Sequence, residues 1–360
     1  MNSNFQAISS NRKTKTFNNP ERFIEGWYWL IPSRELKKGR VKPVNLLGKE
    51  LAIYRGTDGT VVAVDAYCPH MGAHLAEGKV EGNGLRCFFH NWKFDSEGAC
   101  VEIPCLDELL PVKLKTWHTA EKYGMIWVWT GKTPEQPLPF VPELEYEECD
   151  SAFATTFEKN CHPNLVMINA IDAQHFNTVH NLPLEISFER QELNQNAITF
   201  SNTTRGGENS FFLKLIRPFY KSAVTYSMCY WYGSTTTVTV GPDFLHFHIM
   251  FALRLTEGGK TQGHTILITK KRQGIHGWIF NRIVLWLTKM VGNYFAKGDT
   301  RVFQTVKFDL KTPTKADLSV IQFMQHVEKQ KAIAWGSWQQ SIPAITSHQD
   351  RDLREIRTND

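Results

Sequence analysis

Two short motifs of cysteine and histidine constrain this chain more than any other feature. Cys68-Pro-His70 is followed, after sixteen residues, by Cys87-Phe-Phe-His90. A [2Fe–2S] cluster can be held by two cysteines on one iron and two histidines on the other. A Cys2His2 zinc site uses the same ligand set, but zinc fingers usually pair cysteine with cysteine and histidine with histidine. Because each motif here mixes the two residue types, the sequence predicts the mixed-ligand iron–sulfur cluster.

The surroundings of the motifs suit two loops that hold such a Rieske-type centre. Each motif follows a short strand-like run, so the loops are expected at the ends of hairpins with the histidine edge facing outward. His74 lies at the wrong offset for a ligand and is expected at the surface or beside a ligand. Turn conformations near the metal are expected at Gly72, Gly78 and Gly98.

Length and composition limit the class of protein. With 360 residues, 42% of them hydrophobic, the chain is long enough for two domains. The net charge of +5 comes from scattered basic residues, which permits an acidic redox partner but predicts no nucleic-acid binding. Seven cysteines form no evident disulfide framework, so a reducing, cytoplasmic setting is expected. Neither a signal peptide nor a transmembrane helix is expected.

The pattern along the chain changes near residue 135. Residues 1–25 are polar and predict an N-terminal extension. Residues 26–135 contain short alternating runs separated by turn residues, which predicts a small all-β domain carrying the [2Fe–2S] cluster. The proline-rich segment 132–139 marks a boundary, and residues 136–360 are expected to form the second domain.

The second domain is predicted to be α+β. One helical segment is expected near 164–180, and two more near 276–296 and 314–332. Between them lie strand-like runs, and the combination predicts an antiparallel sheet that curves around a long helix, a helix-grip arrangement. The runs are Ala197–Thr203, Phe211–Ile216, Ala223–Tyr232, Thr235–Val240, Leu245–Leu255 and His264–Lys270.

A second metal motif lies in the first helical segment. Asp172, His175 and His180 fall within nine residues, which invites a mononuclear iron site of two histidines and one carboxylate. On a regular helix the two histidines point about 140° apart, so a local π-turn is expected to bring them together. Asp172 is better placed to accept a hydrogen bond from a ligand histidine than to bind the metal.

The third metal ligand is expected to be a carboxylate from elsewhere in the chain. Asp299 is favoured because it follows an apolar helical pattern and would sit at the end of a helix that packs on the first. Asp309 and Asp317 fall in a polar stretch that is expected to be exposed. Asp243 completes the set of candidates.

From about Trp27 to residue 335, the chain resembles the Rieske non-haem iron oxygenases. The two cysteine–histidine motifs match their cluster domain, and Asp-x2-His-x4-His at 172–180 matches their iron motif. Asp299-Thr-Arg-Val-Phe is similar to the segment that supplies the carboxylate in the ketosteroid-hydroxylase-like branch. The resemblance therefore implies that His175, His180 and Asp299 bind Fe(II). Two departures from the family pattern are Met71, where arginine is common, and Asn91, where glycine is usual.

The resemblance also implies an electron route. Electrons from NAD(P)H are expected through a flavin reductase, a ferredoxin or both. They would enter the cluster and cross to the iron of the neighbouring subunit in a head-to-tail homotrimer. Asp172 would bridge the two centres, hydrogen-bonded between His90 on the cluster side and His175 on the iron side.

The expected substrate is small and lipophilic, such as a steroid-like or other alicyclic molecule. Hydroxylation, desaturation and demethylation all remain open, because the position of the substrate decides among them. An aromatic-ring hydroxylase, which often carries a separate β-subunit, is the alternative. An electron-transfer protein with a ligand-binding domain is a further one. The apolar run Trp278–Phe295 is consistent with a core helix, a gate to the pocket or a peripheral membrane contact.

Overall fold

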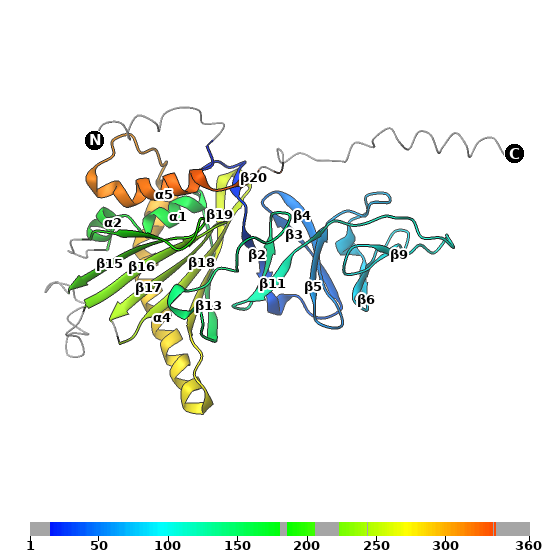
Figure 1. The fold of residues 1–360 in the computed structure, drawn as a ribbon, viewed down its shortest axis with the longest axis horizontal. Coiled ribbons are helices and arrows are strands. Elements are labelled where there is room, and N and C mark those ends of the chain that lie inside the picture. The colour runs from blue at the N-terminus through cyan, green and yellow to red at the C-terminus, as the bar shows by residue number, and fades with distance from the viewer. Residues whose placement is uncertain (1–14, 181–185, 206–222, 243, 334, 336–360) are drawn as a thin grey trace.

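The computed structural model describes residues 15–180, 186–205, 223–242, 244–333 and 335. An N-terminal half built from small sheets lies beside a half built on one large sheet (Figure 1). The predicted strand Phe211–Ile216 and the candidate ligand Asp243 lie outside the described residues.

Short antiparallel strands form most of the N-terminal half, as predicted. Strands β2–β12 are arranged as three sheets with the orders β10-β5-β4-β3, β11-β12-β2 and β6-β7-β8-β9, whereas β1 pairs with β20. The last of these sheets carries the second cysteine–histidine motif, between β7 and β8. The strands are β1 (Phe23–Ile24), β2 (Trp27–Pro32), β3 (Arg40–Leu46), β4 (Lys49–Arg55), β5 (Val61–Asp65), β6 (Lys79–Glu81), β7 (Gly84–Arg86), β8 (Lys93–Phe94), β9 (Cys100–Glu102), β10 (Thr116–Trp117), β11 (Thr119–Lys122) and β12 (Met125–Trp129).

The C-terminal half is a seven-stranded antiparallel sheet with helices, in the order β13-β19-β18-β17-β16-β15-β14. This confirms the predicted α+β class with a large sheet around a long helix. The strands are β13 (Cys149–Lys159), β14 (Glu189–Glu192), β15 (Ile198–Arg205), β16 (Ala223–Trp231), β17 (Thr235–Pro242), β18 (Phe247–Thr256), β19 (Lys260–Lys270) and the short β20 (Ala332–Ile333). The helices are α1 (Pro163–Asn169), α2 (Ala173–Thr178), α4 (Gly274–Thr305) and α5 (Leu318–Lys329).

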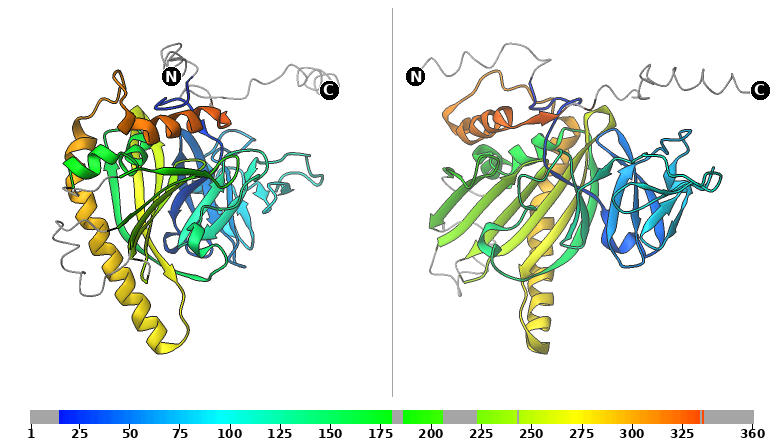
Figure 2. Two further views of the ribbon diagram at one scale, coloured as in Figure 1. Left: turned by 60° about the vertical axis from the view of Figure 1, so that its left-hand side comes forward. Right: turned by 45° about the vertical axis from the view of Figure 1, so that its right-hand side comes forward.

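Helix α4 is longer than predicted, with 32 residues and a length of about 48 Å. Val284, Leu285 and Thr288 are buried on the side that faces the sheet, where Leu285 packs with Ile249 and Leu267. The first turns of α4 extend beyond the strands, and the other end reaches the region of α2 (Figures 1 and 2). Among the described residues, no helix combines the length and apolarity that crossing a bilayer requires.

Tryptophans of the N-terminal half form the join between the two halves. Trp29 of β2 is buried in one apolar cluster with residues of the large sheet. The Arg254 guanidinium of β18 lies 3.9 Å from the centroid of the Trp29 ring, and Arg254 Nη1 donates to the Leu30 carbonyl at 3.2 Å. A cation held over an aromatic face away from water is a favourable contact. These contacts fix the sheet of β2 against the large sheet.

Residues near the two ends of the described chain also meet. β1 pairs with β20, with Phe23 opposite Ile333. The Trp335 ring packs against the rings of Phe23, at 4.8 Å, and Trp117, at 5.5 Å, measured between centroids. A C-terminal residue thus completes part of the apolar core of the N-terminal half. The divisions after residues 25 and 135 stay predictions.

Candidate metal centres

The two cysteine–histidine motifs form loops that are closed in the same way. The Cys68 N–H donates to the Ala73 carbonyl at 2.9 Å, and the Cys87 N–H donates to the Trp92 carbonyl at 2.9 Å. Each loop therefore places its cysteine inside, where Cys68 and Cys87 are 4% and 1% exposed. The histidines lie further out on the same loops, with His70 exposed and His90 half-buried.

The two candidate histidine ligands lie next to each other, and so do the two cysteines. The two histidine rings lie 4.6 Å apart, and the His70 ring stacks on Trp92 at 4.5 Å, both measured between centroids. Burial, followed by the neighbouring Cys87, raises the pKa of the Cys68 thiol to about 11. A metal ion that binds there displaces the thiol proton. Two inner sulfurs and two outer nitrogens fit a Rieske [2Fe–2S] cluster.

Close backbone packing shapes these loops. Gly72 has the predicted turn conformation, with φ +73°. Gly78 does not: its φ is −78°, and it is needed because a Cβ there would lie 2.2 Å from the Arg86 carbonyl oxygen. Asn91, which stands where the family usually has glycine, has φ +59°. Asparagine tolerates this left-handed conformation better than most residues, which explains the departure.

Arg86 anchors the second ligand loop, a role that was not predicted from the sequence. Its guanidinium makes ion pairs of 2.7 Å with both Glu81 and Glu102. Arg86 Nη1 also donates to the carbonyl of Asn91, next to His90, at 2.7 Å. Its position directly before Cys87 was the one available signal.

His74, which was expected at the surface or beside a ligand, is half-buried and has a structural role. Its Nδ1 accepts a hydrogen bond from the Ala76 N–H at 3.1 Å and caps the short helical turn Leu75–Glu77. Its ring packs against Tyr67, with 5.2 Å between centroids.

The helix predicted over 164–180 is two short helices, α1 and α2, with a break between them. Asp172 ends the break, with ψ 102°, and caps α2: its Oδ1 accepts from the backbone N–H groups of Gln174 and His175, both at 3.0 Å. The predicted π-turn is wrong, because α2 ends at Thr178. His180 reaches the site from beyond the helix end, so helical periodicity does not restrict it.

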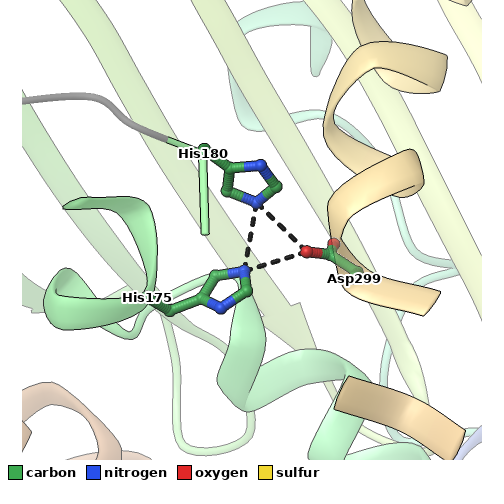
Figure 3. A group of neighbouring side chains, drawn as sticks. All are labelled: His175, His180 and Asp299. Atoms are coloured by element: carbon green, nitrogen blue, oxygen red, sulfur yellow. Dashed lines mark hydrogen bonds and ion pairs between the residues drawn. The ribbon is translucent and has the colours of Figure 1, made fainter. Parts of the chain in front are cut away.

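His175, His180 and Asp299 meet at one point (Figure 3). Asp299 Oδ1 lies 2.9 Å from His175 Nε2 and 3.1 Å from His180 Nε2, and the two nitrogens are 3.0 Å apart. Two ligand atoms about 2.1 Å from a divalent metal are about 3.0 Å apart when they meet at a right angle, and about 3.4 Å apart in a tetrahedron. The three atoms thus fit one face of an octahedron, the facial arrangement of non-haem Fe(II) sites.

The electrostatics of this site suit a cation. His175 and His180 are buried. Burial by itself would raise the pKa of Asp299, but hydrogen bonds from His175 and then His180 outweigh it and lower the pKa to about 2. An ionised carboxylate between two imidazoles supplies the charge that a divalent metal needs.

The other carboxylates proposed as ligands lie elsewhere. Asp309 is exposed, as predicted. Asp317 is half-buried; its Oδ2 accepts from the Thr314 N–H at 2.7 Å, and its Oδ1 accepts from Gln174 Nε2 at 3.2 Å. Among the described residues, Asp299 is therefore the carboxylate that joins the two histidines.

Aromatic residues surround the triad, and most of them were not predicted. The His180 ring lies 5.1 Å from Phe295 and 5.9 Å from Phe176, between centroids. Tyr226 packs on Phe176 at 5.1 Å, and its hydroxyl donates to the Ala170 carbonyl, in the break before α2, at 2.6 Å. Phe295 stands one helical turn before Asp299, so its place was open to prediction once Asp299 was chosen.

Gly298 leaves room for the side chains of Val179 and His180. A Cβ at residue 298 would lie 2.9 Å from Val179 Cγ1 and 3.3 Å from the His180 ring. Because moving a side chain off its rotamer costs about 0.5–1.5 kcal/mol, Gly298→Ala should lower iron affinity about 2- to 10-fold. Chelator titration measures this. Gly292→Ala, on the same helix but near Ile249, is the control; an equal loss in both variants would contradict the assignment.

The chain is similar in sequence to one family model and to several known proteins. A family model described as the Rieske [2Fe-2S] domain matches residues 26–118. Cholesterol 7-desaturase of Bombyx mori is 38% identical over 171 residues, which are 46% of this chain and 37% of that protein. The oxygenase component of a 3-ketosteroid-9-alpha-monooxygenase of Rhodococcus rhodochrous is 31% identical over 169 residues, 45% of each chain. The chain thus spans less than half the length of these two relatives.

Solved structures share the fold over most of the chain. Dicamba monooxygenase bound to dicamba superimposes with a TM-score of 0.58 at 17% sequence identity. The match covers 85% of this chain and 96% of that one, so both halves and their arrangement are common to the two proteins.

Proposed function

We propose that this chain is the terminal oxygenase component of a Rieske non-haem iron oxygenase. It would use O2 and electrons supplied by a reductase to hydroxylate, desaturate or demethylate a lipophilic substrate. One observation carries the proposal: His175, His180 and Asp299 place three ligand atoms 2.9–3.1 Å apart in a chain that also holds a Rieske ligand set.

The side chains around the triad define what the site does. His175, His180 and Asp299 place their ligand atoms as one face of an octahedron does, so the positions opposite them would be left for O2 beside a substrate. A ferrous ion bound there would supply the oxygen chemistry, with the cluster as the source of an electron. The Phe176 and Phe295 rings lie 5.9 Å and 5.1 Å from the His180 ring, between centroids, and would favour a hydrocarbon substrate.

The position of the two centres supports electron transfer between copies of the chain, which the proposed homotrimer requires. The cluster loops lie beside β6–β9 at one end of the molecule, whereas α2 lies at the other end (Figure 1). Since electron tunnelling falls steeply with distance, the electron would come from the cluster of another copy. Large apolar side chains are exposed around the cluster loops, as an interface would need. They are Tyr67, Met71, Phe88, Phe89, Leu106 and Leu109.

Asp172 is the proposed bridge between the cluster of one subunit and the iron of the next. Its carboxylate caps α2 through the N–H of His175, so it is fixed beside an iron ligand. It is half-buried and would be reached by His90 of a neighbouring copy. A reductase, alone or with a ferredoxin, would supply the cluster.

The steroid-like substrate class is proposed from two sources. The named activities of the relatives above concern a sterol and a ketosteroid. The aromatic residues around His180 are consistent with a bulky apolar molecule.

The deciding experiment is EPR of the anaerobically reduced protein with nitric oxide and a panel of steroid-like and aromatic compounds. Nitric oxide reports an open ferrous site, and the reduced cluster gives a separate signal. A nitrosyl signal that shifts with the steroid-like compounds alone is expected. A cluster signal without a nitrosyl signal would favour an electron-transfer protein, and a shift with aromatic compounds alone would favour an aromatic-ring hydroxylase.

A further inference from the structure

The N-terminal part of α4 carries an exposed apolar face. Trp286 and Ile275 on this face are 59% and 71% exposed, while the opposite side of the helix packs on the sheet. A helix that is apolar on all sides is normally surrounded by protein or lipid. The large exposed apolar and aromatic residues that make up the face are Ile275, Trp278, Ile279, Ile283, Trp286, Met290 and Tyr294.

The shape of this face suits contact with a flat surface. At 3.6 residues per turn its members span about 160° of the helix circumference and a length of about 28 Å. The first turns of α4 extend beyond the strands of the large sheet in every view (Figures 1 and 2). An open groove lies in the face, lined by Trp278, Arg282 and Trp286.

The charge on the face indicates what covers it. Residues 274–298 contain no aspartate or glutamate. Around the helix, Arg282 and Lys289 lie next to each other within the apolar arc, between Trp278 at its edge and Ile275, and the Arg282 guanidinium is 5.4 Å from the centroid of the Trp278 ring. Anionic phosphates complement this arrangement. A second copy of the helix would not complement these cations, because residues 274–298 of that copy would bring further cations and no carboxylates.

We propose that this face of α4 binds an anionic lipid bilayer. Trp286 and Ile279, at the centre of the arc, would enter the boundary between headgroups and acyl chains, and the helix would lie in the membrane plane. Arg282 and Lys289 would remain at the level of the phosphates. Binding does not depend on the proposed oxygenase activity; only the further step, that a lipophilic substrate enters from the same bilayer, rests on it.

Sedimentation of the full chain with vesicles tests the proposal. Vesicles of phosphatidylcholine alone are compared with an equal mixture of phosphatidylcholine and phosphatidylserine. Two double variants separate the apolar and electrostatic contributions: Ile279→Ser with Trp286→Ser, and Arg282→Gln with Lys289→Gln. Phe244→Ser removes a similarly exposed aromatic residue outside α4, since Phe244 is 63% exposed, and serves as the control. The visible spectrum of the cluster checks that each variant is folded.

The wild-type chain and the Phe244 control should sediment with the mixed vesicles. The Ile279/Trp286 variant should lose at least about tenfold in partitioning, because each of these side chains contributes its apolar area. The Arg282/Lys289 variant should lose the preference for phosphatidylserine. Wild-type protein that stays in solution with both vesicles would overturn the proposal. An oligomer that dissociates in the Ile279/Trp286 variant without any lipid binding would overturn it too, in favour of a contact between copies.

Discussion

Asp299→Ala should leave the Rieske cluster in place and remove the mononuclear iron, with activity at least about 100-fold lower. Changes of residues that only support a metal ligand already cost about 10- to 100-fold, and Asp299 supplies a ligand atom itself. The substitution removes the carboxylate that lies within 3.1 Å of both imidazoles, so two neutral ligands would remain for a divalent ion. Iron and sulfide content per chain, together with the visible spectrum, measure the two metal centres separately.

Asp309→Ala is the matched control for this experiment. Asp309 was an alternative candidate ligand, is exposed, and lies ten residues further along the chain. The Asp309→Ala variant should keep both metal centres and full activity. If the Asp299 variant retained mononuclear iron, or if the Asp309 variant lost it, the assignment of the carboxylate ligand would be wrong.

Asp172→Asn should keep both metal centres yet lower coupled turnover by at least about 100-fold. Asparagine caps a helix about as well as aspartate, so the hydrogen bonds to the N–H groups of Gln174 and His175 should persist. What the variant loses is the negative charge of the proposed bridge between the two centres. The decisive measurement is single-turnover oxidation of the reduced cluster after O2 and substrate are added, followed by its visible absorbance.

Asp172→Ala separates the role in electron transfer from the role in capping. It removes the cap as well, which costs about 1 kcal/mol, so it should also lower thermal stability, whereas the asparagine variant should not. Rapid cluster oxidation in Asp172→Asn would show that the electron takes another path.

The cluster motifs and the sheet were predictable because their signals are local. Cys68 to His90 lie within 23 residues, and the spacing by itself identifies the ligand set. The strands β15–β19 follow alternating or apolar runs, so their approximate limits could be predicted. Asp299 was predictable only as one of four carboxylates, since its contact with His175 spans 124 residues.

The errors come from tertiary contacts that override local pattern. The stretch 164–180 has helical periodicity throughout, yet the helix is broken. The Tyr226 hydroxyl donates a hydrogen bond to the Ala170 carbonyl, and the Ser319 hydroxyl donates one to the Ile171 carbonyl, each at 2.6 Å. These bonds satisfy carbonyls that a continuous helix would have used, and they stabilise the break. Gly298 was missed for a similar reason: only the fold shows that the His180 ring lies against it.

The strand pair β1–β20 has a consequence for the design of chimeric enzymes. The Trp335 ring packs against the rings of Phe23 and Trp117. The apolar core of the N-terminal half therefore includes a contact with a residue that follows the C-terminal half in sequence. A chimera that joins residues 15–129 to a foreign iron-binding half would leave an unfilled apolar site there, unless it also carried residues 332–335. The exchangeable module of this protein is therefore discontinuous in sequence.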